Sequence, residues 1–468
     1  MVKEGTTDDG AKRGHSGEAV TITAVTTVAP ALPVQEHRLA LSNLDLILPP
    51  IDVGVFFCYA DAGAGAAAVL KAALAKMLVA YYPLAGEVVA NTDGEPELLC
   101  SGRGVDVAEA TAGDAEMRDL RLGFPDESVE QLVPKKKAGV VSVQVTKFRC
   151  GGAVVGCTFD HRVCDAYSFN MFLLAWAAAA RGGPAPPSPS FRRSLLAPRH
   201  HPTPPCTTGT LADRLFVPVS RAPPLPETTA ANRIYRIAAA DVAALQAAAG
   251  PGRTKLEAFT AHLWGLHAEA ASRRRISSCC MGVVVDGRSR LHGDMATYFG
   301  NVLSIPYGVL GSEELRRMEL AEVAGEVHRW VAEAAKGEHF RELVEWVEAR
   351  RPEPTVARAY LGRGEGGEEA TACVVSSGMR LAVGEVDFGW GTPAFASYHF
   401  PWPGGAGYVM PMPSARGDGD WVVYVHVAPE VVEAMEEEPT VFRALEMAGC
   451  LAGNEMVAPS AAAPTYAN

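Results

Sequence analysis

The sequence predicts a mixed α/β protein with two domains, and three observations support this prediction. The chain has 468 residues, which is too long for one ordinary domain and long enough for two substantial hydrophobic cores. A proline-rich stretch near the middle separates two halves. Apolar residues follow both helical and strand spacing within each half. Hydrophobic residues make up 48% of the chain and charged residues 21%, a composition typical of globular proteins.

The first domain is expected at residues 19–182. Residues 1–18 are polar and charged, lack the apolar core of a signal peptide, and are expected to be disordered. Farther along, apolar residues at helical spacing predict a helix that ends at Pro83, because proline cannot continue the backbone hydrogen bonds. These residues are Leu70, Leu74, Met77, Leu78 and Tyr81.

Two strands and a second helix complete the expected first domain. Alternating valines at positions 141, 143 and 145 predict a strand. The mostly apolar run 153–159 predicts a buried strand. Asp165 then begins a helix, because an aspartate in front of apolar residues at helical spacing is a common N-cap. The apolar side of this helix consists of Phe169, Phe172, Leu173 and Trp176.

Residues 183–226 are rich in proline, which predicts a linker or a long surface connection. The second domain is expected at residues 227–468. In it, Thr254 followed by Glu257 matches a helix capping box. Apolar residues at every second position of 421–427 predict a strand. Both halves therefore combine helices with strands.

Charge and cysteine usage narrow the classes of partner and compartment. The net charge is -12, which argues against nucleic acid or an anionic membrane as the main partner but leaves room for a local basic patch. The 10 cysteines are scattered without a CxxC pair, so we expect reduced thiols in a cytoplasmic protein. No apolar run approaches the ~20 residues of a membrane helix, and membrane insertion is not expected.

The segment His161-Arg-Val-Cys-Asp165 lies between the expected buried strand and the following helix. A strand-to-helix turn can project a side chain into a cleft from a rigid scaffold. An imidazole with a pKa of about 6.5 is mostly neutral at pH 7, so His161 could take the proton of a hydroxyl that attacks a thioester. A hydrogen-bonded structural histidine is the alternative. Asp165 is expected to cap the helix and to pair with an arginine, and so to support His161 structurally.

Other catalytic signatures are missing from the sequence. It contains no GxSxG serine motif, which leaves an acyl-serine route without support. No HExxH or Cys/His cluster suggests a metal site, and no GxGxxG or Walker sequence suggests a nucleotide loop. The string Asp387-Phe-Gly-Trp-Gly391 carries two glycines at spacing typical of a tight turn.

Five motifs spaced along the chain resemble those of the BAHD family of plant acyl-CoA-dependent acyltransferases, and they follow the same order as in that family. Besides the histidine and DFGWG motifs, they are LSNLD at 41–45, YPLAG at 82–86, and the block formed by DGRSRL at 286–291 with YFGN at 298–301. The resemblance covers residues 20 to about 450. The last block is typical of the hydroxycinnamoyl-transferring branch, which includes shikimate O-hydroxycinnamoyltransferases of phenylpropanoid metabolism.

The resemblance implies two domains with a chloramphenicol acetyltransferase-like fold, a channel between them, and a monomer. Acyl-CoA would enter from one face as a co-substrate and the acceptor from the other, with no tightly bound cofactor and no metal. His161 matches the catalytic base of the family, and Asp165 its structural aspartate, for which Arg288 is the candidate partner. Four residues match a motif with a mainly structural role: Asp387, Gly389, Trp390 and Gly391.

The sequence departs from the family pattern next to the second motif. Similar enzymes usually have Thr-Ser-Trp where this chain has Ser376-Ser377-Gly378. Ser376 keeps a hydroxyl that could donate to the tetrahedral oxyanion, whereas Gly378 removes an indole donor. Loss of one such donor can cost ~10²-fold in rate, so another group compensates or the pocket has a different shape. Thr392 replaces the usual basic residue after the motif.

The comparison with the family predicts the class of acceptor mainly through Arg363. It lies 24 residues before Asp387, where shikimate-using enzymes have an arginine that binds the carboxylate of the acceptor. However, Arg363 begins a segment rich in glycine and glutamate (363–369) that is expected to be a mobile loop, so a solvated arginine is the alternative.

We therefore expect an acyltransferase that moves an acyl group, a hydroxycinnamoyl group by resemblance, from CoA to a hydroxyl of a small acceptor. Three alternatives remain. One is an N-acyltransferase acting on an amine such as tyramine, agmatine or a polyamine. Another is a catalytically silent BAHD-like binding protein. The last is a carrier-protein condensation domain, which shares a similar histidine motif but for which the DFGWG string is not typical.

Overall fold

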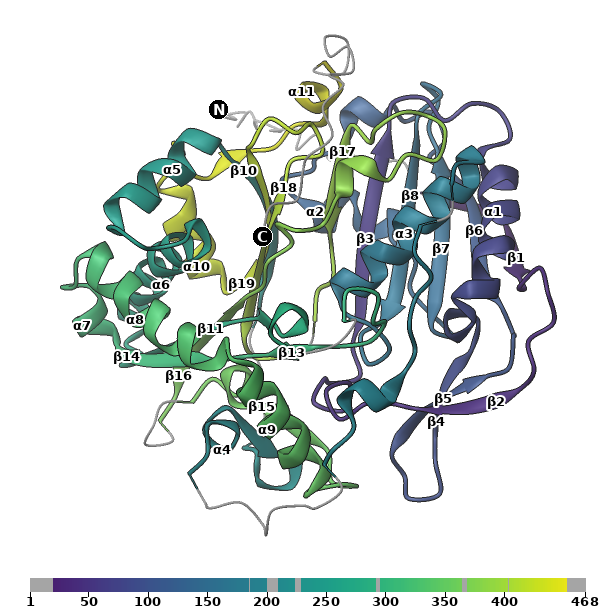
Figure 1. Ribbon diagram of the computed structural model, residues 1–468. Helices are drawn as coiled ribbons and strands as arrows, with labels where there is room; N and C mark the ends of the chain where they lie inside the picture. The colour runs from purple at the N-terminus through teal and green to yellow at the C-terminus, as the bar shows by residue number, and fades with distance from the viewer. Residues whose placement is uncertain are drawn as a thin grey trace, which may run out of the picture.

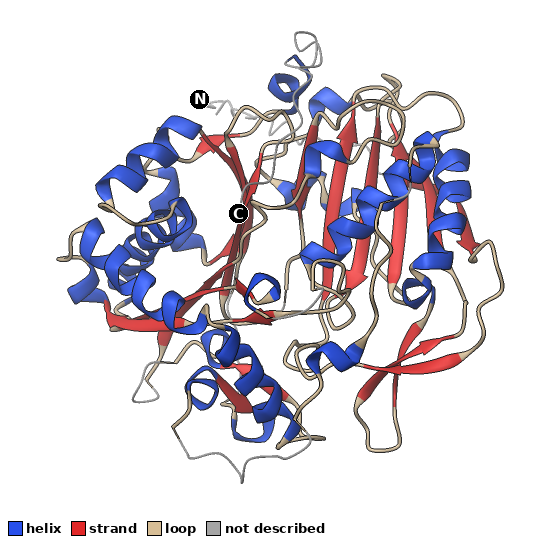
Figure 2. Cartoon of the chain, in the orientation of Figure 1, coloured by secondary structure: helices blue, strands red, loops and turns tan. Residues whose placement is uncertain are grey.

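The structure is a computed structural model, and it describes residues 20–184, 186–199, 209–223, 229–291, 295–363, 368–402 and 404–452. The expected disordered start at 1–18 lies outside these residues. Two lobes stand side by side, each with one large sheet (Figures 1 and 2). None of the helices in the described ranges is long and apolar enough to cross a membrane.

The first lobe contains a six-stranded sheet of order β1-β6-β7-β8-β3-β17. Only β6 and β7 are parallel, and all other neighbours are antiparallel. Helices α1 (Ala66–Ala80) and α3 (Ala166–Arg181) pack side by side on one face, where the Trp176 indole nitrogen donates to the Leu70 carbonyl at 3.0 Å (Figure 1). The strands are β1 (Thr21–Val28), β3 (Asp52–Tyr59), β6 (Val105–Thr111), β7 (Val141–Lys147), β8 (Ala153–Asp160) and β17 (Phe395–Tyr398).

The second lobe contains a seven-stranded sheet of order β14-β11-β16-β18-β19-β10-β20. Its helices cover the side that faces away from the first lobe (Figure 2). The strands are β10 (Ala231–Ile237), β11 (Ser278–Val283), β14 (Tyr307–Gly311), β16 (Ala370–Val375), β18 (Gly407–Pro413), β19 (Trp421–Val427) and β20 (Arg443–Ala444). The helices are α5 (Ala239–Ala248), α6 (Lys255–Arg274), α7 (Ser312–Leu315), α8 (Leu320–Ala334) and α10 (Pro429–Glu436).

Smaller elements surround the two sheets. A three-stranded sheet of order β2-β5-β4 consists of His37–Ala40, Pro96–Cys100 and Glu87–Ala90. Two strand pairs are β12 (Val285–Asp286) with β13 (Leu303–Ser304), and β9 (Phe216–Pro218) with β15 (Thr355–Ala357). The remaining α-helices are α2 (Pro125–Ser128), α4 (Leu211–Leu215), α9 (Gly337–Glu348) and α11 (Met447–Ala452).

The local predictions from sequence agree with these elements. The first helix ends at Ala80, and Pro83 lies in the single 3-10 turn that follows, Tyr82–Ala85. The capping box of α6 is present, because the Glu257 amide donates to Thr254 Oγ1 at 3.2 Å and the Thr254 amide donates to the Glu257 carboxylate at 2.7 Å. The fold class predicted from the resemblance is confirmed by the comparisons given below.

The proline-rich stretch 183–226 connects the two halves of the chain and also contributes regular structure and buried side chains to the fold. Its described parts include a 3-10 turn at Arg193–Leu196, the helix α4 and the strand β9. Leu196 and Phe216 are buried in a third hydrophobic cluster, together with residues of α9 and of the segment before β3. Conversely, β17 belongs to the second half of the sequence but pairs with β3 in the first sheet. The stretch 183–226 and strand β17 therefore both connect the two halves of the chain through packing and strand pairing.

Candidate active site

A cavity of about 280 Å³ is lined by residues of both halves of the chain, and His161 lies on its wall. A second cavity of about 710 Å³ shares Leu48 with the first and is lined by Arg162, the residue after His161. The turn that carries His161 therefore lies beside both cavities. Most of the aromatic wall of the first cavity is formed by Phe159, Tyr360, Tyr398, Phe400, Trp402 and Tyr408.

The turn that carries His161 is held at both ends. Strand β8 ends at Asp160, and the His161 amide donates to the Ile51 carbonyl at 3.0 Å. The Arg162 guanidinium binds the Asp160 carboxylate at 3.0 Å and 2.7 Å. Helix α3 begins directly after Asp165, whose side chain accepts from the Ser168 amide at 2.9 Å. The predicted strand–turn–helix setting of His161 is present.

One ring nitrogen of His161 has a fixed partner. Nδ1 lies 3.2 Å from Oδ1 of Asn301. The Asn301 Nδ2 group donates to Asp45 Oδ1 and to the His161 carbonyl, each at 2.9 Å. Because both of these partners are acceptors only, the atom facing Nδ1 must be the amide oxygen. Nδ1 therefore carries the proton in neutral His161, and Nε2 is the unprotonated nitrogen.

Burial lowers the pKa of His161 from its ordinary value of 6.5. Hydrogen bonds to its own backbone and to Asn301 and the nearby charge of Asp165 oppose this effect. Since the lowered pKa favours the neutral form, the imidazole is available as a proton acceptor at neutral pH.

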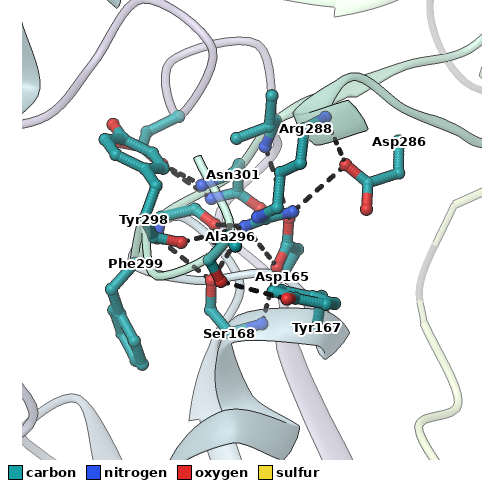
Figure 3. A network of polar contacts seen from close by, with 12 residues as sticks. Asp165, Tyr167, Ser168, Asp286, Arg288, Ala296, Tyr298, Phe299 and Asn301 are labelled. Atoms are coloured by element: carbon teal, nitrogen blue, oxygen red, sulfur yellow. Dashed lines mark hydrogen bonds and ion pairs between the residues drawn. The ribbon is translucent and has the colours of Figure 1, made fainter. Parts of the chain in front are cut away.

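Asp165 binds Arg288, the partner suggested by the resemblance (Figure 3). Two bonds join them, from Nη1 to Oδ2 at 2.7 Å and from Nη2 to Oδ1 at 3.0 Å. Both side chains are buried. Arg288 Nη2 also donates to Ser168 Oγ at 2.9 Å and to the Gly300 carbonyl at 2.8 Å. Asp165 thus caps α3 and fastens it to the second half of the chain.

The DFGWG motif forms a tight turn. Oδ1 of Asp387 accepts from the amides of Gly389, Trp390 and Gly391 at 2.7, 3.0 and 2.9 Å. Both glycines have positive φ, +104° and +85°, which residues with a side chain rarely adopt. Asp387 also contacts Arg181 at the end of α3, 3.7 Å from Nη1 to Oδ2. None of these four motif residues lines the His161 cavity.

A family model described as the Transferase family matches residues 18–441 of the chain. The chain belongs to this family, the BAHD acyltransferases. The match favours an acyl-CoA-dependent acyltransferase over a carrier-protein condensation domain.

Three relatives show the breadth of the family around this chain. It is 28% identical over 439 residues to a hydroxycinnamoyltransferase of Narcissus pseudonarcissus, covering 88% of this chain and 97% of that one. It is 27% identical to a shikimate O-hydroxycinnamoyltransferase of Nicotiana tabacum, with 88% and 97% coverage. It is 31% identical to putrescine hydroxycinnamoyltransferase 1 of Oryza sativa subsp. japonica, with 88% and 96% coverage. Both alcohol- and amine-acylating enzymes thus resemble this BAHD member.

Solved structures support the fold. Vinorine synthase superposes with a TM-score of 0.70 at 19% identity, covering 92% of this chain and all of that one. F. graminearum TRI101 complexed with coenzyme A and T-2 mycotoxin also gives 0.70, at 14% identity, with 86% and 97% coverage. The predicted BAHD fold, with its two mixed α/β domains, is confirmed.

The departures from the family pattern are now located in the structure. Ser376 lines the cavity, and its amide donates to the Val409 carbonyl at 2.8 Å. A Cβ atom at Gly378 would lie 2.5 Å from Cγ of Met412 and 3.1 Å from Cε of Met410. The space that a larger residue would need beside Gly378 is therefore filled by methionine side chains. Met410 lines the cavity, whereas Gly378 and Met412 are not among its lining residues.

Arg363 is not among the residues that line either cavity. It forms an isolated bridge with Glu369, and residues 364–367 of the expected mobile loop lie outside the described part of the chain. Its role in binding an acceptor carboxylate stays a prediction. Within the described ranges, no group of three or more His, Cys, Asp or Glu side chains is placed to hold a metal ion.

Sequence reasoning missed three residues of the site. Asp45 and Asn301 were noticed only as parts of the motifs at 41–45 and 298–301, and nothing in the spacing showed that they meet behind His161. Tyr408 lines the cavity from β18, in a run with no recognisable motif. Burial raises its pKa to about 12, opposed by the Ser376 side chain, so its hydroxyl stays protonated at neutral pH.

Proposed function

We propose that this protein transfers a hydroxycinnamoyl group from CoA to a hydroxyl of a small acceptor, with His161 as the general base. The observation that carries the proposal is the paired Nδ1 atom of a partly buried neutral histidine on the wall of an aromatic cavity. Nε2 is then the nitrogen that can receive a proton from the acceptor. Family membership supports the acyl-CoA-dependent class of reaction.

The reaction follows from the state of His161. As the acceptor oxygen attacks the thioester carbonyl, its proton moves to Nε2, and the new carbon–oxygen bond gives a tetrahedral oxyanion. Collapse of this intermediate breaks the carbon–sulfur bond, and the imidazolium returns the proton to the departing thiolate. General-base assistance of this kind is typically worth roughly 10² to 10⁴ in rate. Asp165 and Arg288 support the turn and take no part in proton transfer.

Two hydroxyl groups can stabilise the oxyanion in this proposal. Ser376 and Tyr408 line the same cavity as His161, on the neighbouring strands β16 and β18 and their ends. Tyr408 supplies a protonated phenol where Gly378 lacks the indole of similar enzymes. Since one oxyanion donor is worth ~10²-fold in kcat, Tyr408→Phe should lower kcat by about that factor with little change in KM. An unchanged kcat would remove Tyr408 from this role.

The aromatic wall favours a planar phenylpropenoid acyl group. Tyr360 and Trp402 meet edge to face at 4.9 Å, and Phe400 and Tyr408 do so at 4.7 Å. Such walls give an aromatic ring apolar area and favourable edge contacts. At the rim, Arg290 and Arg380 are exposed cavity-lining cations that could meet the phosphates of CoA. The second cavity shares Leu48 with the first and would give the acceptor a separate approach.

A hydroxyl acceptor fits the carboxylates of the site better than an amine does. An aliphatic amine is an ammonium ion at neutral pH, since its pKa is about 10, and is best held by a free carboxylate. In the first cavity, Asp165 and Asp286 both contact Arg288, at 2.7 and 3.4 Å. In the second cavity, Glu95 binds Arg351 at 2.8 and 2.9 Å. Asp165, Asp286 and Glu95 therefore already have cationic partners, whereas Glu353 of the second cavity accepts from the Ser220 hydroxyl and is the carboxylate that an amine would meet there.

An amine acceptor remains the second candidate, because a putrescine hydroxycinnamoyltransferase is among the relatives. A matrix assay of purified protein separates the candidates. It would combine acetyl-CoA and hydroxycinnamoyl-CoAs with shikimate, quinate, monolignols, fatty alcohols, tyramine, agmatine and putrescine, with products read by mass. Ester products with aromatic donors support the proposal. Amide products alone would move the assignment to N-acyl transfer, and no product from any pair would leave a binding protein.

His161→Ala is the decisive variant, and it should lose at least ~10²-fold of kcat with the best substrate pair. His262→Ala is a matched control, because His262 pairs with Glu438 on the second lobe and lines neither cavity. Near-normal turnover by His161→Ala would reject the mechanism. The predicted monomeric state and cytosolic location are further proposals, which gel filtration with light scattering and a fluorescent fusion would test.

A further inference from the structure

Two sequence motifs with no part in the proposed reaction meet behind His161. Asp45 closes the LSNLD motif and Asn301 closes the YFGN motif, and their positions are 256 residues apart. Both side chains are completely buried, at 0% exposure. Asn301 lies directly beside the Asp165–Arg288 network (Figure 3). Asn301 contacts the His161 ring and Asp45 contacts Asn301, so the pair can act on the ring through hydrogen bonds.

The Asp45 carboxylate is saturated by short hydrogen bonds. Oδ1 accepts from the amide and the side chain of Asn301 at 2.7 and 2.9 Å. Oδ2 accepts from the amide and the hydroxyl of Ser42, each at 2.8 Å. Nη2 of Arg193, from the proline-rich stretch, lies 3.7 Å from Oδ2. Because partners surround both oxygens, Asp45 is a fixed acceptor and not an adaptable one.

This fixed acceptor decides which way the Asn301 amide points. In the observed orientation, Nδ2 donates to Asp45 and to the His161 carbonyl, and Oδ1 faces the ring. A flipped amide would set its oxygen against two acceptors and its NH₂ group against Nδ1. A buried unsatisfied polar group costs ~1 to 3 kcal/mol, so the flip is strongly disfavoured while Asp45 carries a carboxylate. The orientation of Asn301 in turn keeps the proton of His161 on Nδ1.

We propose that Asp45 and Asn301 are positioning residues that hold His161 in the Nδ1–H tautomer, with Nε2 free for the acceptor. This inference rests on the proposed function of His161. The role differs from that of Asp165, which contacts the helix end and Arg288 and no nitrogen of the ring. It also gives the two motifs one purpose, because Asp45 orients the Asn301 amide and Asn301 contacts the ring.

The test measures kcat, KM and the pH profile of Asn301→Ala and Asp45→Asn. A wrong tautomer of a catalytic histidine has reduced kcat by ~10⁴ in a serine protease. Here we expect a smaller loss, about 10- to 100-fold in kcat, because the hydrogen bond of His161 to its own backbone remains. KM for acyl-CoA should stay within about twofold. Asp45→Asn keeps the shape of the side chain and is the milder variant if Asn301→Ala fails to fold.

The pH profile has a predicted direction. The Asn301 hydrogen bond raises the pKa of His161, so its removal should shift the acid limb of kcat/KM to lower pH. Other charges near the ring stay in place in Asn301→Ala: Asp160 and Asp165. Behind these are Arg162, which binds Asp160, and Arg288, which binds Asp165. Asp45 itself would lose one partner and keep Ser42 and Arg193.

A direct readout is the ¹⁵N spectrum of labelled histidine, with His161 assigned by its absence in His161→Gln. The parent should show a protonated Nδ1, and both variants should show a mixture of tautomers. Asn232→Ala is the matched control, because Asn232 also bridges an aspartate and a histidine, Asp126 and His426, at 2.8 and 2.9 Å, and does not line the cavity. It should lower stability without changing the His161 signal or the pH profile.

The outcomes are separable. Parent-like kcat in both variants, or a lower kcat with a parent-like His161 spectrum and pH profile, would overturn the positioning role. If His161→Ala turns over normally, the proposed function fails first. If His161→Ala is inactive while Asn301→Ala and Asp45→Asn behave like the parent, only the inference on these two residues fails.

Discussion

Replacing Asp165 by asparagine separates its charge from its capping bond. Asparagine caps helices about as well as aspartate, so Asp165→Asn should keep the bond to the Ser168 amide, 2.9 Å long in the parent. The variant removes the charge that faces Arg288, and both side chains of this pair are at most 5% exposed. Breaking a buried ion pair costs about 3 to 5 kcal/mol, because the remaining ion has no compensating charge. Asp165→Ala also removes the cap, which adds ~1 kcal/mol.

Thermal and urea unfolding would measure these losses. For domains of 150 to 250 residues, 1 kcal/mol shifts Tm by about 2 to 4 °C, so a loss of 3 kcal/mol should lower Tm by roughly 6 to 12 °C. Asp286→Asn is the matched control. Asp286 contacts the same guanidinium at 3.4 Å but its side chain is 29% exposed, so this loss should stay below about 1 kcal/mol. An Asp165→Asn variant with parent-like Tm and no activity would refute the reasoning and make Asp165 a direct partner in catalysis.

Three further outcomes are expected. Because burial lowers the pKa of His161, the neutral base persists to lower pH. The acid limb of the kcat/KM profile should therefore have its midpoint below about pH 6.5, and a midpoint above pH 7 would contradict this. Gly378→Trp should lower Tm and kcat for every acyl-CoA, because its Cβ would lie 2.5 Å from Met412 Cγ; unchanged stability would show that the methionines move aside easily. Asp387→Ala removes three hydrogen bonds to the DFGWG turn and should lower Tm while the acid limb stays in place; a shifted limb would connect this turn with the proton transfer.

Local sequence rules predicted most of the elements that carry the histidine motif. The strand 153–159, the N-cap at Asp165 and the capping box at Thr254 each depend on a few neighbouring residues, and all are present. The Asp165–Arg288 contact was expected only through resemblance to a family, because no spacing rule connects residues 123 positions apart. The same limit applies to Asp45 and Asn301, whose contact depends on how two distant turns pack.

Two predictions from the sequence were incomplete, because composition does not show how a segment packs in the folded protein. Proline content marked 183–226 as a connection, yet Arg193 from this stretch lies 3.7 Å from the buried Asp45 carboxylate and donates to the Phe299 carbonyl at 2.6 Å. Proline excludes regular structure but does not prevent a segment from being packed. Similarly, the missing indole at position 378 predicted a compensating group or a pocket of different shape, and the structure shows strand β18 supplying Met410 and Met412 next to Gly378. Flexible thioether side chains are well suited to such gaps.

Helix α3 connects the two motifs that first distinguished this chain. Its N-cap is Asp165, four residues after His161, and its last residue, Arg181, contacts the Asp387 carboxylate and carbonyl. At 1.5 Å per residue, 16 residues separate these ends by about 24 Å, too far for DFGWG to touch the reacting atoms. Phe388 packs edge to face against Trp176 of the same helix at 4.9 Å, and the chain then continues into β17 of the first sheet. The DFGWG turn thus fixes the C-terminal end of α3. The N-terminal end of the same helix, through Asp165, holds the turn that carries His161. The DFGWG motif can therefore influence catalysis through the position of α3 alone.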